Sequence, residues 1–213
     1  IVTDSQNKRL MLGRWAAAGF QEYSILEFKT SNNCSWELIK DILNIHQPAE
    51  NHTLQSILQT LVESYKTLSR SETFNAILIL LKQQGKKDQV RSIQNGVPLT
   101  DVITPTNYYL STLDFFLLAN YYNIPLIVLC RTKIPTLFSQ YISFLKESPT
   151  NCFIIFAGAY ANAETNHSPI YALLSRDESI QLSIPALGDV FTKITGLNIT
   201  SLQTFIERTK LAK

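Results

Sequence analysis

Apolar residues recur at helical spacing through the first half of the chain. The strongest stripe predicts a helix over about residues 54–65, because its apolar positions lie three and four residues apart. These positions are Leu54, Ile57, Leu58, Leu61, Val62 and Tyr65. Similar stripes predict a helix from Cys34 to just before Pro48 and another from Phe74 to Leu81. The polar, basic stretch 83–96 is expected to be an exposed loop or a loosely held helix.

In the second half of the chain the apolar residues also form short continuous runs, and strands are expected there. A helix is predicted over 108–122, and the apolar run 124–130 that follows it is typical of a buried strand. Two further buried strands are expected at 152–157 and 169–174. The alternating stretch 23–28 fits an edge strand.

These elements predict an α+β fold in which a helical subdomain packs on a small central sheet. Its single domain is expected over 1–176, with the core at about 23–176. Another helix is expected around 137–145, and residues 177–213 are expected to form a C-terminal helical extension, broken at Gly196, that packs on the domain. A chain of 213 residues can bury enough surface to fold without a disulfide or a metal.

Charge and cysteine content narrow the function classes. Nineteen basic and 17 acidic residues give a net charge of +2, too balanced for a dedicated nucleic-acid or membrane-surface protein. No apolar run approaches the length of a membrane span, and the start of the chain does not resemble a signal peptide. The three cysteines, Cys34, Cys130 and Cys152, have no paired spacing, which favours a reducing compartment and a cytoplasmic protein.

Most familiar catalytic motifs are missing from the sequence. It has no P-loop, no dinucleotide-binding glycine motif, no nucleophile elbow and no zincin motif. Three scattered cysteines and three histidines offer no paired metal-ligand spacing, so we expect neither a metal nor a cofactor.

One cysteine and one histidine remain as candidates for chemistry. Cys34 follows the polar turn 31–33 at a predicted helix start, where the helix dipole and unpaired backbone N–H groups favour a thiolate and could hold an oxyanion. His167 lies after a small-residue loop at the entrance to a predicted strand, about 130 residues later. An imidazole there could deprotonate the thiol, with Asn166 or Thr165 orienting it.

The residues around these two positions resemble the OTU (ovarian tumour) superfamily of cysteine proteases. The family opens its catalytic helix with Asp-Gly-Asn-Cys and an aromatic two positions later, and this chain has Ser31-Asn32-Asn33-Cys34-Ser35-Trp36. The helix and apolar strand over 109–128 and the loop, histidine and strand over 166–173 are also similar, so the resemblance spans about 23–175. Ser31 and Asn32 depart from the family's Asp and Gly, and Ser168 replaces the aromatic that usually follows the histidine.

The resemblance implies a thiol hydrolase acting on ubiquitin or ubiquitin-like (iso)peptide bonds. Cys34 would be the nucleophile, His167 the general base and Asn166 a candidate orienting residue, with backbone N–H groups at Asn32, Asn33 and Cys34 stabilising the oxyanion. The same stretch is similar to OTU-like modules within large polypeptides of DNA viruses. The alternative is therefore a catalytically inactive OTU-like module that interacts with other domains of a larger protein.

Simpler interpretations accompany these candidates. Cys34 could be a packed core cysteine, and Cys130 and Cys152 are expected to be inert. His46 and His52 are expected on the solvated surface, and Asp114 either faces solvent or caps a turn. Nucleic-acid binding by the basic stretch 82–91 is a third, less favoured hypothesis, since a solvated loop explains that stretch as well.

Overall fold

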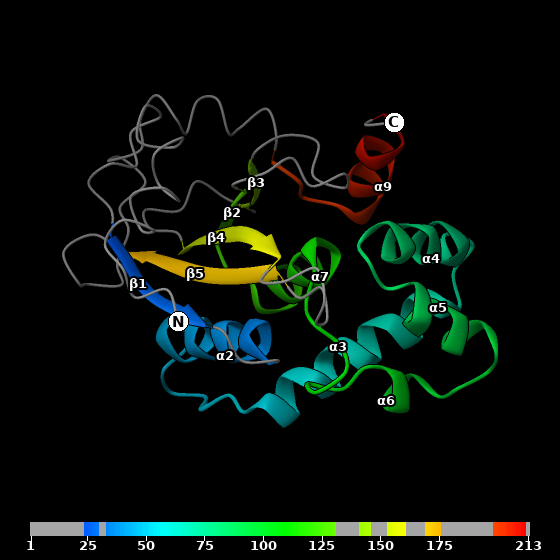
Figure 1. The fold of residues 1–213 in the computed structure, drawn as a ribbon, viewed down its shortest axis with the longest axis horizontal. Coiled ribbons are helices and arrows are strands. Elements are labelled where there is room, and N and C mark those ends of the chain that lie inside the picture. Colours follow the sequence, from blue (N-terminus) through cyan, green and yellow to red (C-terminus); the bar gives the residue numbers. More distant parts are fainter. Residues whose placement is uncertain are drawn as a thin grey trace.

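A mixed sheet of five strands lies on one side of the molecule (Figure 1). The computed structural model describes residues 24–29, 33–130, 141–145, 153–160, 169–175 and 198–211. The strands are β1 (Ser24–Lys29), β2 (Leu126–Cys130), β3 (Tyr141–Phe144), β4 (Phe153–Tyr160) and β5 (Pro169–Ser175). Their order is β1-β5-β4-β2-β3, with β2 and β4 parallel and the other neighbours antiparallel.

The positions of β2, β4 and β1 in the sheet agree with their composition. The uninterrupted apolar runs of β2 and β4 occupy central positions, where Ile127 and Ile154 are fully buried. The alternating segment β1 lies at an edge, as predicted, and β5 confirms the strand expected at 169–174. β1 contains an irregularity, because Ile25 and Glu27 face consecutive residues of β5 and Leu26 is an extra residue.

The helix expected around 137–145 is wrong where the structure describes it. Residues 141–144 form β3, which pairs with β2 along its whole length. A four-residue segment is too short for its apolar spacing to separate a helix from a strand, so pairing with β2 decides.

Seven helices are described: α2 (Cys34–His46), α3 (Leu54–Ser69), α4 (Phe74–Gln83), α5 (Lys87–Gln94), α6 (Leu99–Val102), α7 (Thr112–Tyr122) and α9 (Leu202–Leu211). The helices predicted from Cys34, Leu54 and Phe74 are confirmed. α7 begins four residues later than expected because Ser111 caps it. None of the described helices has the length and apolarity needed to span a membrane.

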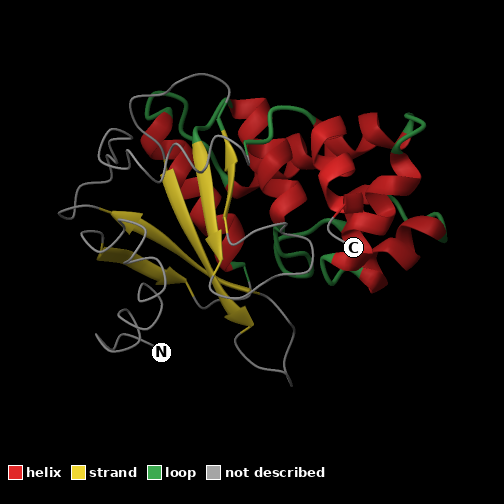
Figure 2. Ribbon diagram, turned by 90° about the horizontal axis from the view of Figure 1, so that it is seen from above, coloured by secondary structure: helices red, strands yellow, loops and turns green. Residues whose placement is uncertain are grey.

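The helices gather along one side of the sheet and extend beyond it (Figure 2). α2 packs on β1 and β5, and α7 contacts α3 and β3. α9 packs on α4, and its fully buried Phe205 lies 5.7 Å from the ring of Phe116. These contacts place the C-terminal helix on the same core, in an α+β architecture; the part of the predicted extension over 177–197 lies outside the described residues.

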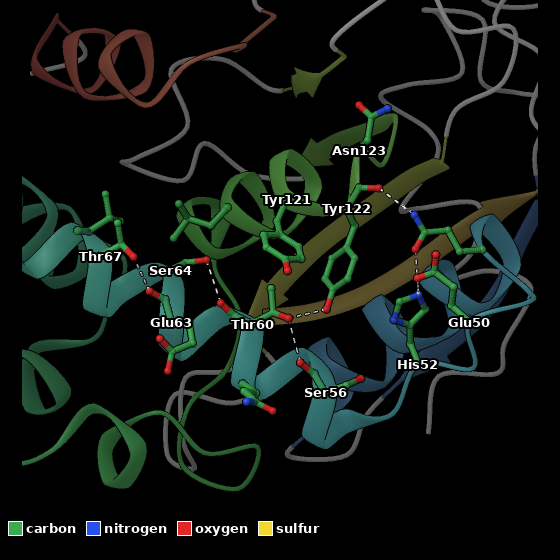
Figure 3. Close-up of a pocket in the computed structure, with 14 residues that line it drawn as sticks. Glu50, His52, Ser56, Thr60, Glu63, Ser64, Thr67, Tyr121, Tyr122 and Asn123 are labelled. Carbon is green, nitrogen blue, oxygen red and sulfur yellow. Dashed lines mark hydrogen bonds and ion pairs between the residues drawn. The ribbon is translucent and has the colours of Figure 1, made fainter.

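A groove opens beyond the C-terminal end of α2, between α3 and the end of α7 (Figure 3). His52 lies on its wall with only 8% of its surface exposed, so the expectation of a solvated histidine is wrong. Its Nε2 atom is 2.9 Å from Gln47 Oε1, and its ring packs edge-on against Tyr122. The contact with Gln47 and the packing against Tyr122 explain why the His52 side chain is buried.

Candidate functional site

Two of the predicted site residues lie within the described chain. Cys34 is the first residue of α2 and Asn33 is its N-cap, as the polar turn before the apolar stripe predicts. Ser31, Asn32, Asn166 and His167 lie outside the described residues, as do the loop residue Thr165 and Cys152. The structure therefore defines the position of Cys34 and that of β5, which begins two residues after His167.

Cys34 is held at a helix start by the main chain. The Asn33 carbonyl accepts hydrogen bonds from the N–H groups of Trp36 (3.0 Å) and Glu37 (3.1 Å), which close the first turn. The Asn33 side chain makes no capping bond to the helix. The first N–H groups of any helix have no acceptor within that helix, and the positive end of the dipole lies beside the Cys34 thiol. Cys34 as a whole residue is 3% exposed.

The pairing of β1 with β5 brings together the strand that precedes Cys34 in the sequence and the strand that follows His167. Lys29, the last residue of β1, lies opposite Tyr171 near the start of β5. Cys34 follows Lys29 by five residues, and His167 precedes Tyr171 by four. The end of β1, which precedes Cys34 in the sequence, and the start of β5, which follows His167, therefore lie at the same end of the sheet. Helix α2 packs on both strands.

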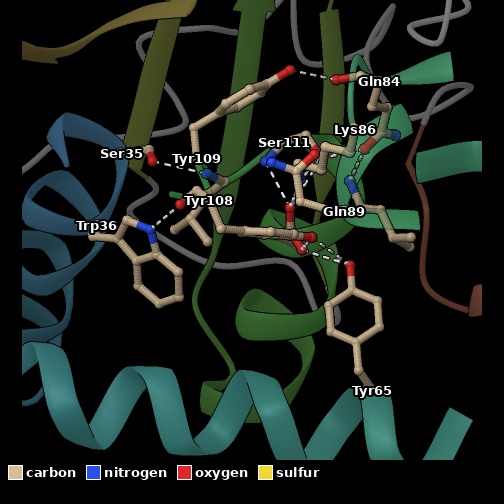
Figure 4. Close-up of polar contacts among 12 residues, drawn as sticks. Ser35, Trp36, Tyr65, Gln84, Lys86, Gln89, Tyr108, Tyr109 and Ser111 are labelled. Carbon is tan, nitrogen blue, oxygen red and sulfur yellow. Dashed lines mark hydrogen bonds and ion pairs between the residues drawn. The ribbon is translucent and has the colours of Figure 1, made fainter. Parts of the chain in front are cut away.

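The residues just after Cys34 hold a second segment in place. The Leu110 N–H donates to Ser35 Oγ (2.9 Å), and Trp36 Nε1–H donates to the Tyr108 carbonyl (2.5 Å) (Figure 4). Ser35 and Trp36 are fully buried, so these bonds are shielded from water. They fix the start of α2 to the stretch that leads into α7.

That stretch ends in a buried carboxylate, Asp114, contrary to the solvent-facing alternative and in agreement with a capping role. Asp114 accepts from the hydroxyls of Tyr65 (2.5 Å) and Tyr108 (2.8 Å) and from the Ser111 N–H (2.8 Å). It also forms an ion pair with Lys86 Nζ, and both side chains are fully buried. The sequence Ser111-x-x-Asp114 is a capping-box pattern that could have revealed this helix start.

Lys86 is the residue that the sequence most clearly misplaces. The stretch 83–96 is expected to be an exposed loop or a loosely held helix, and it does contain α5. Lys86, however, is 0% exposed, and its Nζ lies 4.0 Å from the centroid of the Tyr108 ring. Gly85 makes the turn possible with φ of 85°, and a Cβ atom there would lie 2.5 Å from the Tyr109 hydroxyl, which donates to the Gln84 carbonyl (2.6 Å).

Burial dominates the electrostatics of this cluster. Burial lowers the pKa of Lys86 to about 8, and the charge and hydrogen bond of Asp114 oppose that shift. Burial, and then the negative charge of Asp114, raises the pKa values of Tyr65 and Tyr108 well above their ordinary value. Lys86 is therefore mostly protonated at pH 7, and the cluster is an ion pair satisfied by neutral tyrosines.

Comparison of the chain with models of known protein families, with curated proteins and with solved structures finds no match. Within the described part of the chain, no three histidine, cysteine or acidic side chains are grouped to hold a metal ion. The assignment of the candidate site therefore rests on the geometry described above.

Replacing Asp114 tests whether the ion pair stabilises the fold. Asp114→Asn keeps the size of the side chain but leaves Lys86 buried beside a neutral partner, so we expect the free energy of unfolding to fall by about 3 kcal/mol or more. Urea denaturation measures this loss. Asp101→Asn, the same change at an exposed position of α6, should stay within about 0.5 kcal/mol of the wild type. Similar losses in both variants would contradict a structural role for the pair.

The lowered pKa of Lys86 predicts how stability depends on pH. Above pH 8 the folded protein loses this proton, whereas the unfolded chain keeps it up to its ordinary value of 10.5. The unfolded state then binds more protons, so the free energy of unfolding should rise by about 2 kcal/mol from pH 8 to 9.5. The double variant Lys86→Met/Asp114→Asn should lack this rise in parallel urea titrations. An identical pH profile for the two proteins would refute the assignment.

Proposed function

We propose that this chain is an OTU-like cysteine hydrolase of the cytoplasm that cleaves ubiquitin or ubiquitin-like (iso)peptide bonds. The observation that carries the proposal is the pairing of Lys29 with Tyr171, with Cys34 as the first residue of the helix packed on both strands. This pairing directs the two sequence segments that flank Cys34 and His167 to the same end of the sheet. A Cys-His pair needs such convergence from positions far apart in the sequence.

In the proposed reaction His167 takes the proton from the Cys34 thiol as the sulfur attacks the carbonyl carbon of the scissile bond. Backbone N–H groups of Asn32, Asn33 and Cys34 stabilise the negative oxygen of the tetrahedral intermediate. The protonated His167 then gives its proton to the leaving amine, and the carbonyl remains bound to sulfur as a thioester. Water, deprotonated by the same histidine, hydrolyses the thioester and restores the thiol. Asn166 would orient the imidazole.

The contacts after Cys34 support this proposal. A nucleophile must be held in one place, and the bonds from Leu110 to Ser35 and from Trp36 to Tyr108 hold the first turn of α2 from the buried side. Trp36 also matches the aromatic that the OTU family has two positions after its cysteine.

A specific observation favours the second candidate, an inactive OTU-like module of a larger protein. Cys34 is 3% exposed, a degree of burial that is common for cysteines that only pack. The departures at Ser31 and Asn32 lie in the turn that would supply oxyanion donors, and one such donor is typically worth about 3–4 kcal/mol of the barrier.

A ubiquitin whose C-terminus carries a thiol-reactive electrophile distinguishes the two candidates. The wild-type chain should form a covalent adduct, detected by mass spectrometry, and Cys34→Ala should abolish it. His167→Ala should slow labelling at least about 100-fold because the thiol loses its base. The matched controls Cys130→Ala and His46→Ala should still label, provided that circular dichroism shows them folded.

The opposite result is equally clear. A folded wild type that labels with neither ubiquitin nor ubiquitin-like electrophiles, and that cleaves none of the corresponding substrates, would favour the non-catalytic module. Labelling that survives Cys34→Ala would also refute the assignment of the nucleophile.

A further inference from the structure

The groove between α3 and α7 has a volume of about 980 Å³. Its α3 wall extends from Ser56 to Leu68, about 18 Å along a helix axis. This length matches about five residues of an extended chain. Its other walls come from Tyr121 to Asn123 and from the segment after α2.

The α3 wall offers hydrogen-bond acceptors. The hydroxyl of Thr60 donates to the Ser56 carbonyl (3.0 Å), Ser64 donates to the Thr60 carbonyl (2.9 Å), and Thr67 donates to the Glu63 carbonyl (3.0 Å) (Figure 3). Each hydroxyl has a single proton, so only its lone pairs remain for a ligand. Because the proton of Thr60 is used in this way, the Tyr122 hydroxyl at 2.7 Å acts as donor to Thr60.

The groove wall carries two carboxylates, and one of them, Glu50, has its Oε2 atom 3.4 Å from His52 Nε2. Glu50 and Glu63 lie on its wall with side chains 63% and 61% exposed, and the lining, which falls within the described residues 47–123, contains no lysine or arginine. Lys66 lies outside the lining and pairs with Glu63 at 3.0 Å. That pair is solvent-exposed and contributes little to stability, so a cationic side chain of a ligand can replace Lys66 at Glu63.

An exposed aromatic ring completes the lining. Tyr121 is 66% exposed, an unusual position for a large ring, and its centroid lies 4.9 Å from that of Tyr122. Leu68 and Leu117 add apolar surface beside it. A guanidinium group combines five donors with a flat face that stacks on tyrosine, so arginine fits acceptors, carboxylates and ring together.

We propose that this groove binds an extended segment of a partner protein that carries arginine or lysine side chains. The acceptor-rich wall, the two carboxylates and the exposed Tyr121 ring match such a segment in charge and in hydrogen bonding. The length of the α3 wall favours a peptide over a single small cation.

The groove is a separate place from the proposed hydrolase site. It lies beyond the C-terminal end of α2, whereas Cys34 is the first residue of that helix, which is 13 residues or about 20 Å long. Peptide binding should therefore be unchanged in Cys34→Ala, and the two proposals can fail independently.

Fluorescence anisotropy with a labelled octapeptide of alternating arginine and glycine tests the proposal on the full chain. We expect this peptide to bind at least about ten-fold more tightly than the same peptide with glutamine in place of arginine, and its affinity to fall with added salt. The double variant Glu50→Gln/Glu63→Gln should weaken binding about five- to ten-fold, and Tyr121→Ala about three-fold. Glu72→Gln, at an exposed position outside the groove, is the matched control and should bind as the wild type does.

Three results would overturn the proposal. Equal binding of the arginine and glutamine peptides would remove the charge argument, and unchanged affinity in the folded double variant would place the peptide elsewhere. Binding of spermine more tightly than the arginine peptide would show a site for small polyamines instead. Thermal unfolding of each variant separates a lost contact from a lost fold.

Discussion

The carboxylate of Asp114 joins segments that no run of neighbouring residues could hold together. Through its ion pair and hydrogen bonds it connects α3 at Tyr65, the turn after α4 at Lys86 and the cap of α7 at Ser111. Tyr108 donates to the same carboxylate and accepts from Trp36 through its carbonyl, which extends the connection to α2. Burying two charges is costly, and the surrounding donors are what make the arrangement tolerable. The helices are thereby tied to α2, which packs on β1 and β5.

Hydrophobic periodicity predicted most of this fold because it reports which face of a local element is buried. The stripe from Leu54 to Tyr65 produced a helix, and the apolar runs at β2 and β4 produced central strands. Pairing between segments is not a local property. Residues 141–144 became β3 by hydrogen bonding to β2, and Lys86 became buried because Asp114, 28 residues away, supplies its counter-charge. A charged residue within a basic stretch carries no local mark of such a partner.

In the candidate site too, local features could be predicted from the sequence and contacts between distant segments could not. The position of Cys34 at a helix start was predictable, since small polar residues before an apolar stripe mark an N-terminus. Its link to Tyr108 and Leu110 was not, because Ser35 and Trp36 reach residues more than 70 positions away. The role of His167 stays a prediction, supported by the register of β1 and β5. Function here depends on contacts between distant segments more than on any short motif.

The extra residue in β1 sets the alignment of that register. Without Leu26 as an insertion, Lys29 would face Ile170 instead of Tyr171, and every β1 residue after the irregularity would point to the opposite side of the sheet. The end of β1 would then lie about 3.3 Å nearer the start of β5. The extra residue Leu26 therefore sets how far β1 extends along β5. The number of residues after the irregularity determines where β1 ends. Changing that count by one would shift the end of β1, the strand that precedes Cys34 in the sequence, without changing the chemistry of any residue near it.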